Sequence, residues 1–255
     1  MKLKQLLSIL IIFLSLSSCD MFNPEKIYNS NMAAGLVHFK NKRYKRALRK
    51  FGAAANTKPD EAEAYFWIGA AADLIKEKPI EYSIGAYKKA VELDPTHIEA
   101  HFALSSIYME MEKYDEAKKH LDAILSVKPN DYETLNSYGT FYAKQKNYDK
   151  AVEYFNKVLN IKPKYRQTLL NMGRIYCYQE KYKEAQKYFK LVKKYYKDIP
   201  VGFYWTAFTA EKLGNQEEAI QNWKKTIEIG IKKDMDYENL KKARNHLKKL
   251  YEKTK

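Results

Sequence analysis

The stretch YETLNSYGTFYAKQKNYDKAVEYFNKVLNIKPKY, residues 132–165, decides the fold of this chain. It holds two small residues, Gly139 and Ala151, then the bulky Phe155 four places after the second, and Pro163 near its end. A small residue on one helix lets a second helix approach closely, and the large side chain fills the groove between them. Proline ends a helix or begins the next one. The stretch therefore predicts two packed helices followed by a break.

The same pattern recurs along almost the whole chain. The second small residue returns at intervals of 36, 34, 34, 34 and 34 residues, and the bulky residue returns in step with it. The first small residue returns at intervals of 34, 36, 34, 34 and 34 residues. A fixed period of this length indicates a solenoid. The first small residues are Gly35, Gly69, Ser105, Gly139, Gly173 and Ala207. The second are Ala47, Ser83, Ala117, Ala151, Ala185 and Ala219. The bulky residues are Phe51, Tyr87, Leu121, Phe155, Phe189 and Trp223.

The unit at residues 132–165 resembles the tetratricopeptide repeat family. Its matching residues are Leu135, Tyr138, Gly139, Tyr142, Ala151, Phe155, Val158 and Pro163. The resemblance implies an all-α, right-handed superhelical solenoid of about six helix pairs in residues 28–233. We expect the repeats at about 28–61, 62–97, 98–131, 132–165, 166–199 and 200–233. Residues 234–255 are expected to form a basic capping helix and tail, because a solenoid must cover its last apolar face.

Some positions depart from the repeat pattern. Two extra residues near Lys78 and Pro79 lengthen the second repeat, and His38 stands where the first repeat should have a tyrosine. Pro200 suits the first turn of a helix. We expect the first two repeats to be slightly irregular.

The amino terminus predicts a secretion signal. Lys2 and Lys4 precede an apolar run at residues 6–16, which is too short to span a bilayer as a helix of roughly 20 residues. Leu-Ser-Ser-Cys at residues 16–19 is similar to a bacterial lipobox, which implies a signal peptide at 1–18 and a lipid on Cys19. An ordinary signal peptide with a chance cysteine is the alternative. We expect a lipid-anchored protein outside the cytoplasm, with residues 19–27 as tether, and leave the leaflet open.

The formal net charge is +15, and three explanations are available. The charge can attract anionic lipid, attract an acidic partner, or reflect a lysine-rich composition without functional meaning, which we favour. Nucleic acid is not an expected partner, because export argues against it. A basic cluster near the carboxyl end is the best candidate for contact with anionic lipid. It consists of Lys241, Lys242, Arg244, Lys248 and Lys249.

The resemblance implies a partner-binding groove lined by the first helix of each repeat. Exposed aromatic and methionine side chains in such a surface suit apolar anchors of a peptide or helix. The alternative is that some of these side chains pack inside, since a register shift of one position exchanges surface for core. The expected groove residues are Met32, Leu36, Phe39, Phe66, Leu74, Phe102, Ser106, Met109, Asn136, Thr140, Leu170, Arg174, Tyr178, Tyr204 and Phe208.

No motif in the sequence predicts catalysis. His97, Glu99 and His101 are spaced unlike a zinc-protease helix, and no third ligand is evident. Cys177 is expected to be a half-buried thiol. No phosphate loop and no set of nucleophile, base and orienting residue is recognisable. We therefore expect no metal, no cofactor and no enzymatic activity.

The function that these observations favour is a membrane-anchored scaffold. It would bind segments of partner proteins in its groove and assist the assembly of an envelope complex. The architecture is similar to that of the pilotin-type repeat lipoproteins of type IV pilus assembly, an analogy that rests on no diagnostic residue. The alternative is an accessory protein that holds a small apolar ligand for a transporter.

Overall fold

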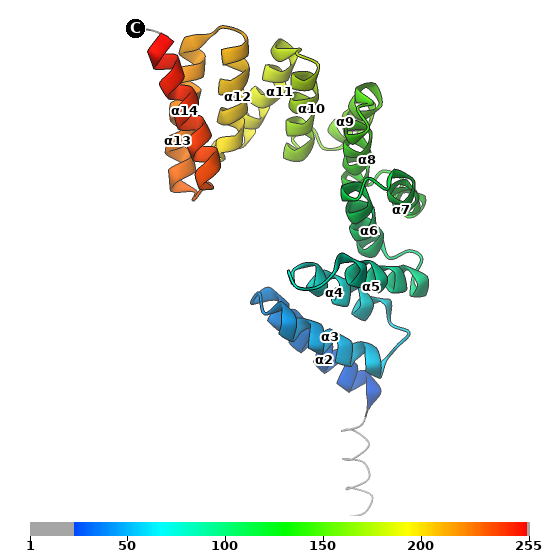
Figure 1. The fold of residues 1–255 in the computed structure, drawn as a ribbon. Helices are drawn as coiled ribbons and strands as arrows, with labels where there is room; N and C mark the ends of the chain where they lie inside the picture. The colour runs from blue at the N-terminus through cyan, green and yellow to red at the C-terminus, as the bar shows by residue number, and fades with distance from the viewer. Residues whose placement is uncertain (1–22, 254–255) are drawn as a thin grey trace, which may run out of the picture. The chain divides into compact units, whose positions relative to one another are not determined.

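The computed structural model describes residues 23–253, and all regular structure in that range is helical (Figure 1). Six helix pairs follow one another, and one further helix comes after the last pair. This confirms the predicted all-α class with six pairs and a capping helix. The helices are α2 (Pro24–Lys40), α3 (Tyr44–Thr57), α4 (Ala62–Asp73), α5 (Ile80–Leu93), α6 (Ile98–Glu110), α7 (Tyr114–Val127), α8 (Tyr132–Lys144), α9 (Tyr148–Ile161), α10 (Arg166–Tyr178), α11 (Tyr182–Tyr195), α12 (Pro200–Lys212), α13 (Gln216–Lys232) and α14 (Tyr237–Lys253).

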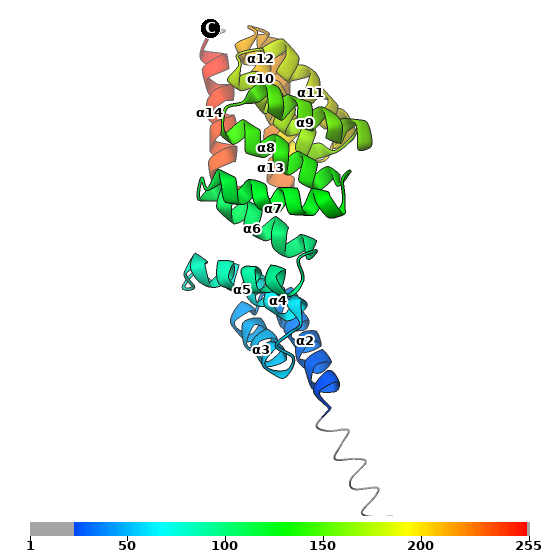
Figure 2. The same ribbon diagram turned by 90° about the vertical axis from the view of Figure 1, so that its right-hand side faces the viewer.

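The chain divides into two compact units between Pro129 and Asn130. In the first unit the two helices of each pair pack together, and α3 also packs on α4 and α5 on α6. Figure 2 shows the same pairs from the side. In the second unit α10 contacts α8, α9 and α11, α11 packs on α12, and α14 packs on α13.

The close approach predicted from the small and bulky residues is present in the structure. A Cβ atom added to Gly139 would lie 2.3 Å from Cε1 of Phe155. The equivalent separations are 2.4 Å for Gly35 and Phe51, 2.6 Å for Gly69 and Tyr87, and 2.4 Å for Gly173 and Phe189. Interiors are packed to near crystal density, so no methyl group fits between these helices without displacing a ring.

The helix ends follow the prolines as predicted. Each of α3, α5, α7 and α9 ends two residues before a proline. The proline ring clashes with the residue before it and so disfavours helical geometry at that residue. Those prolines are Pro59, Pro95, Pro129 and Pro163. Pro200 is the first residue of α12. The loop between α4 and α5, residues 74–79, contains the predicted insertion.

The first helix begins earlier than predicted, inside the segment 19–27 that we expected to be a tether. Residues 24–27, which we assigned to it, form the first turn of α2, where the Asn23 side chain accepts a hydrogen bond from the Glu25 N–H at 2.9 Å. That cap satisfies a helix donor that has no partner within the helix, so the helix begins earlier than the repeat pattern requires. Cys19 and the predicted signal segment lie outside the described residues.

Three side chains join α14 to the pair before it. Trp223 of α13 donates a hydrogen bond from Nε1 to the Glu211 carboxylate of α12, and His246 of α14 lies 3.0 Å from the same carboxylate through Nδ1. The imidazole also stacks on the Trp223 indole, with ring centroids 4.8 Å apart. We call Glu211, Trp223 and His246 the cap contact. Ala243 and Leu250 of α14 are buried beside it, as expected of a capping helix.

No helix within residues 23–253 combines the length and the apolar character that crossing a bilayer requires.

Candidate functional site

The expected groove residues lie on the first helix of each pair, except Leu74, which directly follows α4, and most of these side chains reach solvent. Leu36 and Leu74 are 39% and 49% exposed, and Tyr178 is 71% exposed. The side chains of Phe39, Phe66, Phe102, Ser106, Asn136, Thr140, Leu170, Tyr204 and Phe208 are half-buried, and Arg174 is exposed.

Met32 and Met109 are exceptions, because both are buried. Met32 is 8% exposed and belongs to the core cluster that contains Tyr28 and Phe51. Met109 is 7% exposed at the end of α6. A long, unbranched thioether fills gaps between helices, so methionine at a boundary position packs inward where a ring or a charged group would stay outside. The expectation that these two line an open groove is wrong.

The second unit contains a cavity of about 510 Å³ between two successive repeats. Its walls are the carboxyl-terminal parts of α8 and α10, the turn between α8 and α9, and the amino-terminal part of α9. We call it the repeat 4–5 pocket. It brings together three predicted groove residues, Thr140, Arg174 and Tyr178. The remaining lining residues are Ala143, Lys144, Lys146, Tyr148, Phe155, Asn171 and Ile175.

Ring stacking and hydrogen bonds between repeats position the side chains of this pocket. The exposed Tyr178 ring stacks on Tyr148, which begins α9, with centroids 6.2 Å apart and planes at 12°. The Asn171 amide donates to the Thr140 hydroxyl at 3.5 Å. One turn earlier, the Thr168 hydroxyl donates to the Asn136 side-chain oxygen at 2.8 Å. These bonds join α8 to α10 and hold the pocket walls in register.

The pocket is positively charged. Lys144, Lys146 and Arg174 line it, and none of its lining residues is a carboxylate. The Arg174 guanidinium lies 5.6 Å from the Trp205 ring centroid, a cation–π distance. An exposed aromatic face beside cationic side chains and a side-chain amide can bind a polypeptide that brings an anionic group and an apolar anchor.

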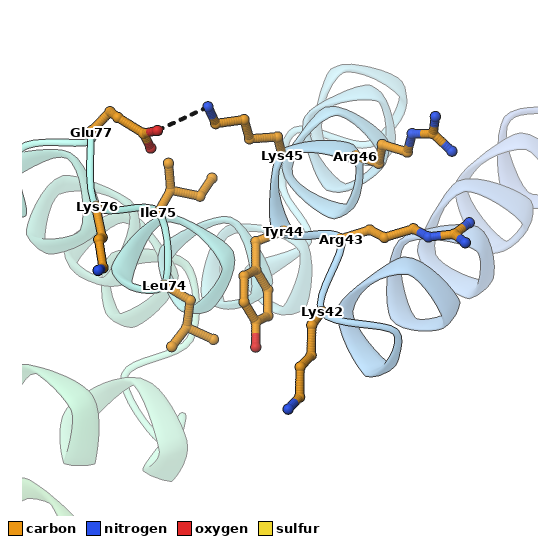
Figure 3. A pocket seen from close by; sticks show the side chains of 9 residues that line it. All are labelled: Lys42, Arg43, Tyr44, Lys45, Arg46, Leu74, Ile75, Lys76 and Glu77. Atoms are coloured by element: carbon orange, nitrogen blue, oxygen red, sulfur yellow. Dashed lines mark hydrogen bonds and ion pairs between the residues drawn. The ribbon is translucent and has the colours of Figure 1, made fainter.

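The first unit has an equivalent pocket, shown in Figure 3, with a volume of about 710 Å³. We call it the repeat 1–2 pocket. It lies at the turn between α2 and α3 and at the end of α4. Tyr44 and Leu74 occupy the places that Tyr148 and Tyr178 have three repeats later. The other lining residues are Lys42, Arg43, Lys45, Arg46, Ile75, Lys76 and Glu77.

Three further aromatic groove residues, Phe39, Phe66 and Tyr204, are engaged by neighbouring rings. Phe39 meets Trp67 edge to face at 5.2 Å, and Phe66 lies 5.2 Å from the same indole and 5.1 Å from His97. Tyr204 meets Trp223 edge to face at 4.9 Å. These ring contacts position the side chains of the groove. Only part of each ring surface is left for contact with a partner protein.

The histidines of the sequence His-Ile-Glu-Ala-His have structural partners. His97 Nδ1 accepts a hydrogen bond from the Ala100 N–H at 3.3 Å and so caps α6. His101 Nε2 donates to the Pro95 carbonyl at 3.0 Å, so its Nδ1 accepts from His120 Nδ1 at 2.8 Å. Within residues 23–253, no group of three or more His, Cys, Asp or Glu side chains is arranged to hold a metal ion.

The half-buried side chains of His120 and Cys177 have shifted pKa values. Burial, together with the nearby His101, Lys119 and Lys88, lowers the pKa of His120 to about 4. Burial raises the pKa of the half-buried Cys177 thiol to about 11, so the thiol stays protonated at neutral pH.

Sequence reasoning missed several pocket residues, namely Tyr148, Asn171, Lys144 and Lys146. A signal for the tyrosine was available, because Tyr44, Tyr114, Tyr148 and Tyr182 recur at the same place after the turn. The stacking partner of each depends on the next repeat, and a pattern within one repeat does not contain it.

Comparison with solved structures shows the same fold at low sequence identity. The chain is similar to PilW, described as a widely conserved type IV pilus biogenesis factor, with a TM-score of 0.72 and 15% identity, covering 85% of this chain and 97% of that one. It is similar to PilF of Pseudomonas aeruginosa with a TM-score of 0.68 and 15% identity, covering 87% of this chain and 98% of that one.

Among curated proteins, a peroxisomal targeting signal receptor of Candida albicans is 30% identical over 96 residues. That match covers 38% of this chain and 16% of the receptor, so the chain matches only a small part of the receptor's length.

Family models agree with the repeat pattern and the helix pairs. Three tetratricopeptide repeat models match residues 32–98, 83–136 and 130–198. Together they extend without a gap over residues 32–198 of the 255, the region in which the structure places successive helix pairs. The chain belongs to the tetratricopeptide repeat family.

Proposed function

We propose that this chain is a membrane-tethered, non-enzymatic scaffold that binds segments of partner proteins on its first-helix face and assists the assembly of an envelope complex. The observation that carries the proposal is the repeat 4–5 pocket, in which the widely exposed Tyr178 stands beside Arg174. Exposed aromatic side chains and arginine are enriched where proteins bind one another. The likeness to pilus biogenesis factors supports the envelope setting by fold analogy alone.

The charge of the pocket favours a polypeptide over a small apolar ligand. Three cationic side chains line it, and an apolar ligand has no anionic group to place against them. A protein segment can place a carboxylate against Arg174 and an apolar side chain against Tyr178. The residues that line the pocket include no carboxylate, imidazole or thiol, which suits binding better than acid–base chemistry.

The membrane tether belongs to the same proposal. If residues 1–18 are removed, only four residues, 20–23, would separate a lipid-bearing Cys19 from the start of α2 at Pro24. Two or more acyl chains hold a protein firmly, at about 0.8 kcal/mol per buried CH₂. The anchor would lie outside the cytoplasm, and the leaflet is left open.

The basic face of α14 adds a second proposed contact with the membrane. Its five cationic residues, Lys241, Lys242, Arg244, Lys248 and Lys249, are all exposed. Near an anionic surface each can contribute about 1 kcal/mol.

Site-specific photo-crosslinking tests the groove. A photoreactive phenylalanine analogue replaces Tyr178 in intact cells, and adducts are identified by mass spectrometry. Tyr237 is the matched control, because it is an equally accessible tyrosine, 68% exposed, that lies on α14 outside the pocket. We expect a discrete protein adduct from position 178 and none of the same identity from position 237.

The result separates the two candidate functions. Failure of position 178 to give a protein adduct in a folded protein, or the same adducts from both positions, would contradict the scaffold proposal. A reproducible small-molecule adduct in native mass spectrometry of the delipidated protein would support the transporter-accessory alternative instead.

A further inference from the structure

The arginines of this chain are not spread evenly. The sequence has six, and three of them, Arg43, Arg46 and Arg49, fall within seven residues at the start of α3. Their spacing of three places them along one side of the helix. A lysine-rich composition accounts for a high net charge, but it does not account for a local concentration of arginine. We call these three residues the arginine face.

The arginine face lacks compensating carboxylates. All three arginines are exposed, and within residues 23–253 none of them forms an ion pair. The one carboxylate in the repeat 1–2 pocket, Glu77, pairs with Lys45 at 3.2 Å. Figure 3 shows this ion pair on one side of the pocket, whereas the Arg43 and Arg46 side chains extend away from it.

The position on the helix makes this arrangement unfavourable for the fold itself. A helix amino terminus carries a partial positive charge, so acidic residues stabilise the first turn and cationic residues destabilise it, by roughly 0.3–1 kcal/mol each. The second helix of every other pair has an acidic residue in its first turn, whereas α3 has none. Those residues include Glu81, Asp115, Asp149, Glu184 and Glu217. In α3, Lys45 and Arg46 stand in the first turn instead. Residues that lower the stability of a fold can be retained by selection when they serve a function.

Two adjoining concavities give the surface its shape. Arg46 lines both the repeat 1–2 pocket and a second cavity of about 450 Å³ between α2 and α3. Arg49, Lys50 and His38 line the second cavity, and the His38 Nδ1 atom is buried there without a hydrogen-bond partner. In the first cavity the half-exposed Leu74 lies beside the Tyr44 ring. The surface thus presents planar guanidinium groups, the unpaired Nδ1 atom of His38 and the apolar side chain of Leu74.

We propose that the arginine face of α3 is a docking surface for an acidic segment of a partner protein, one in which carboxylates alternate with an apolar side chain. Planar guanidinium groups bind carboxylates through two parallel hydrogen bonds, and Leu74 receives the apolar residue. A flat bilayer surface does not fill two concavities. Single-stranded nucleic acid would need an open stacking platform, but the Tyr44 ring is half-buried and meets Phe39 edge to face at 5.4 Å.

This surface is distinct from the repeat 4–5 pocket and does not depend on the proposed groove function. An acidic segment can bind α3 whether or not a second segment occupies the pocket near Tyr178. Variants at Arg174 or Tyr178 are therefore expected to leave binding at the arginine face unchanged.

Fluorescence anisotropy with the protein comprising residues 19–255 tests the proposal. The probe is a labelled peptide, acetylated and amidated, that repeats Glu-Glu-Leu-Asp. The test variant carries Arg43→Gln, Arg46→Gln and Arg49→Gln. The matched control removes the same charge from exposed lysines on and beside α7 in the same unit, through Lys113→Gln, Lys119→Gln and Lys128→Gln. A third variant changes the three arginines to lysine.

We expect the glutamine variant to lose at least about tenfold in peptide affinity, the lysine variant to lose less, and the control to lose about twofold or less at physiological salt. The melting temperature of the glutamine variant should equal or exceed that of the wild type, because cations leave a helix amino terminus. Loss of affinity therefore cannot be attributed to unfolding.

Three results would overturn the proposal. The first is equal peptide affinity of the glutamine variant and the wild type. The second is a loss of affinity in the lysine control as large as that in the glutamine variant, which would show an effect of net charge alone. The third is arginine-dependent binding that is tighter to phosphatidylglycerol vesicles or to a labelled oligothymidylate than to the acidic peptide, which would assign the surface to phosphate groups.

Discussion

Gly139 and Phe155 are in direct contact across their helix pair: a Cβ atom on Gly139 would lie 2.3 Å from Cε1, 2.4 Å from Cδ1 and 2.7 Å from Cζ of the Phe155 ring. The ring is fully buried between the two helices, so a methyl group on Gly139 requires the ring or a helix to shift. Gly139→Ala should therefore lower the free energy of unfolding, by about 1–3 kcal/mol, the usual cost of overpacking a core. Urea unfolding followed by circular dichroism measures the change.

Gly85→Ala is the control for that substitution. Gly85 lies inside α5, is exposed, and would place its Cβ where nothing lies within 4 Å. Alanine there should stabilise the protein by about 0.5–1 kcal/mol, because glycine is a poor helix former. If both substitutions changed stability in the same direction, the packing account of Gly139 would be wrong.

The proposed lipid on Cys19 has a control within the chain, since the sequence contains one other cysteine, Cys177. Cells grown with an alkyne fatty acid should label the wild type and the Cys177→Ser variant equally, because the Cys177 thiol is half-buried and the burial-raised pKa of about 11 keeps it protonated. Cys19→Ser should abolish the label and release the protein from membranes. Labelling that persists in Cys19→Ser would refute the anchor.

Acid should weaken the first unit through His120. Burial, then the charges of His101, Lys119 and Lys88, lower the pKa of His120 from about 6.5 to about 4 in the folded protein. Between these values the unfolded chain binds a proton that the folded state does not. The stability that His120 contributes is therefore complete above about pH 6.5 and is lost as the pH falls towards 4.

The His120→Gln variant tests this pH dependence. Because the imidazole is only half-buried and solvent screens part of the effect, we expect a difference on the order of 1 kcal/mol between pH 7 and pH 4.5, present in the wild type and absent in the variant. Loss of the His120 stacking on Tyr108, whose rings lie 5.7 Å apart, lowers stability equally at both values. Parallel pH profiles for the two proteins would contradict the assignment.

The cap contact predicts how firmly α14 is held. In Glu211→Gln the Trp223 hydrogen bond can re-form, but the charged partner of His246 is lost, so α14 should become less protected from hydrogen exchange, by about 1–2 kcal/mol in opening free energy. Glu252→Gln, which removes an exposed pairing with Lys248 at 3.8 Å, should change it by less than about 0.5 kcal/mol. Equal effects of the two substitutions would exclude a special role for Glu211.

The fold could be predicted in detail because its determinants lie within single repeats. Gly139 and Phe155 are sixteen residues apart in the sequence, and their sizes alone require two helices that approach closely. Pro163 marks the end of α9 through local backbone sterics. Each such feature recurs in most repeats. The helices of an irregular repeat can therefore be predicted from the pattern of the regular ones.

The candidate site was predicted only in part, because its contacts join different repeats. The stacking of Tyr178 on Tyr148 and the pairing of His101 with His120 depend on how two helices lie against each other, which the period does not specify. Met32 and Met109 were misplaced for the same reason: burial at a boundary position depends on the gap that neighbouring side chains leave. The absence of an acid at the start of α3 was visible in the sequence, but it acquires meaning only once the helix is known to begin at Tyr44.

The way in which α14 packs on α13 has a consequence for how proteins of this kind change in length. A tetratricopeptide array grows in evolution by copying a helix pair, and a copy is tolerated wherever it meets the same surface on both sides. Behind α13, that surface is occupied by α14, whose His246 fits only a pair that supplies both Glu211 and Trp223. A pair inserted between α13 and α14 therefore keeps the cap contact only if it carries a glutamate and a tryptophan at these places, as a copy of the last pair does. Recombination within the array is then the route by which the protein would gain binding positions without losing its carboxyl-terminal end.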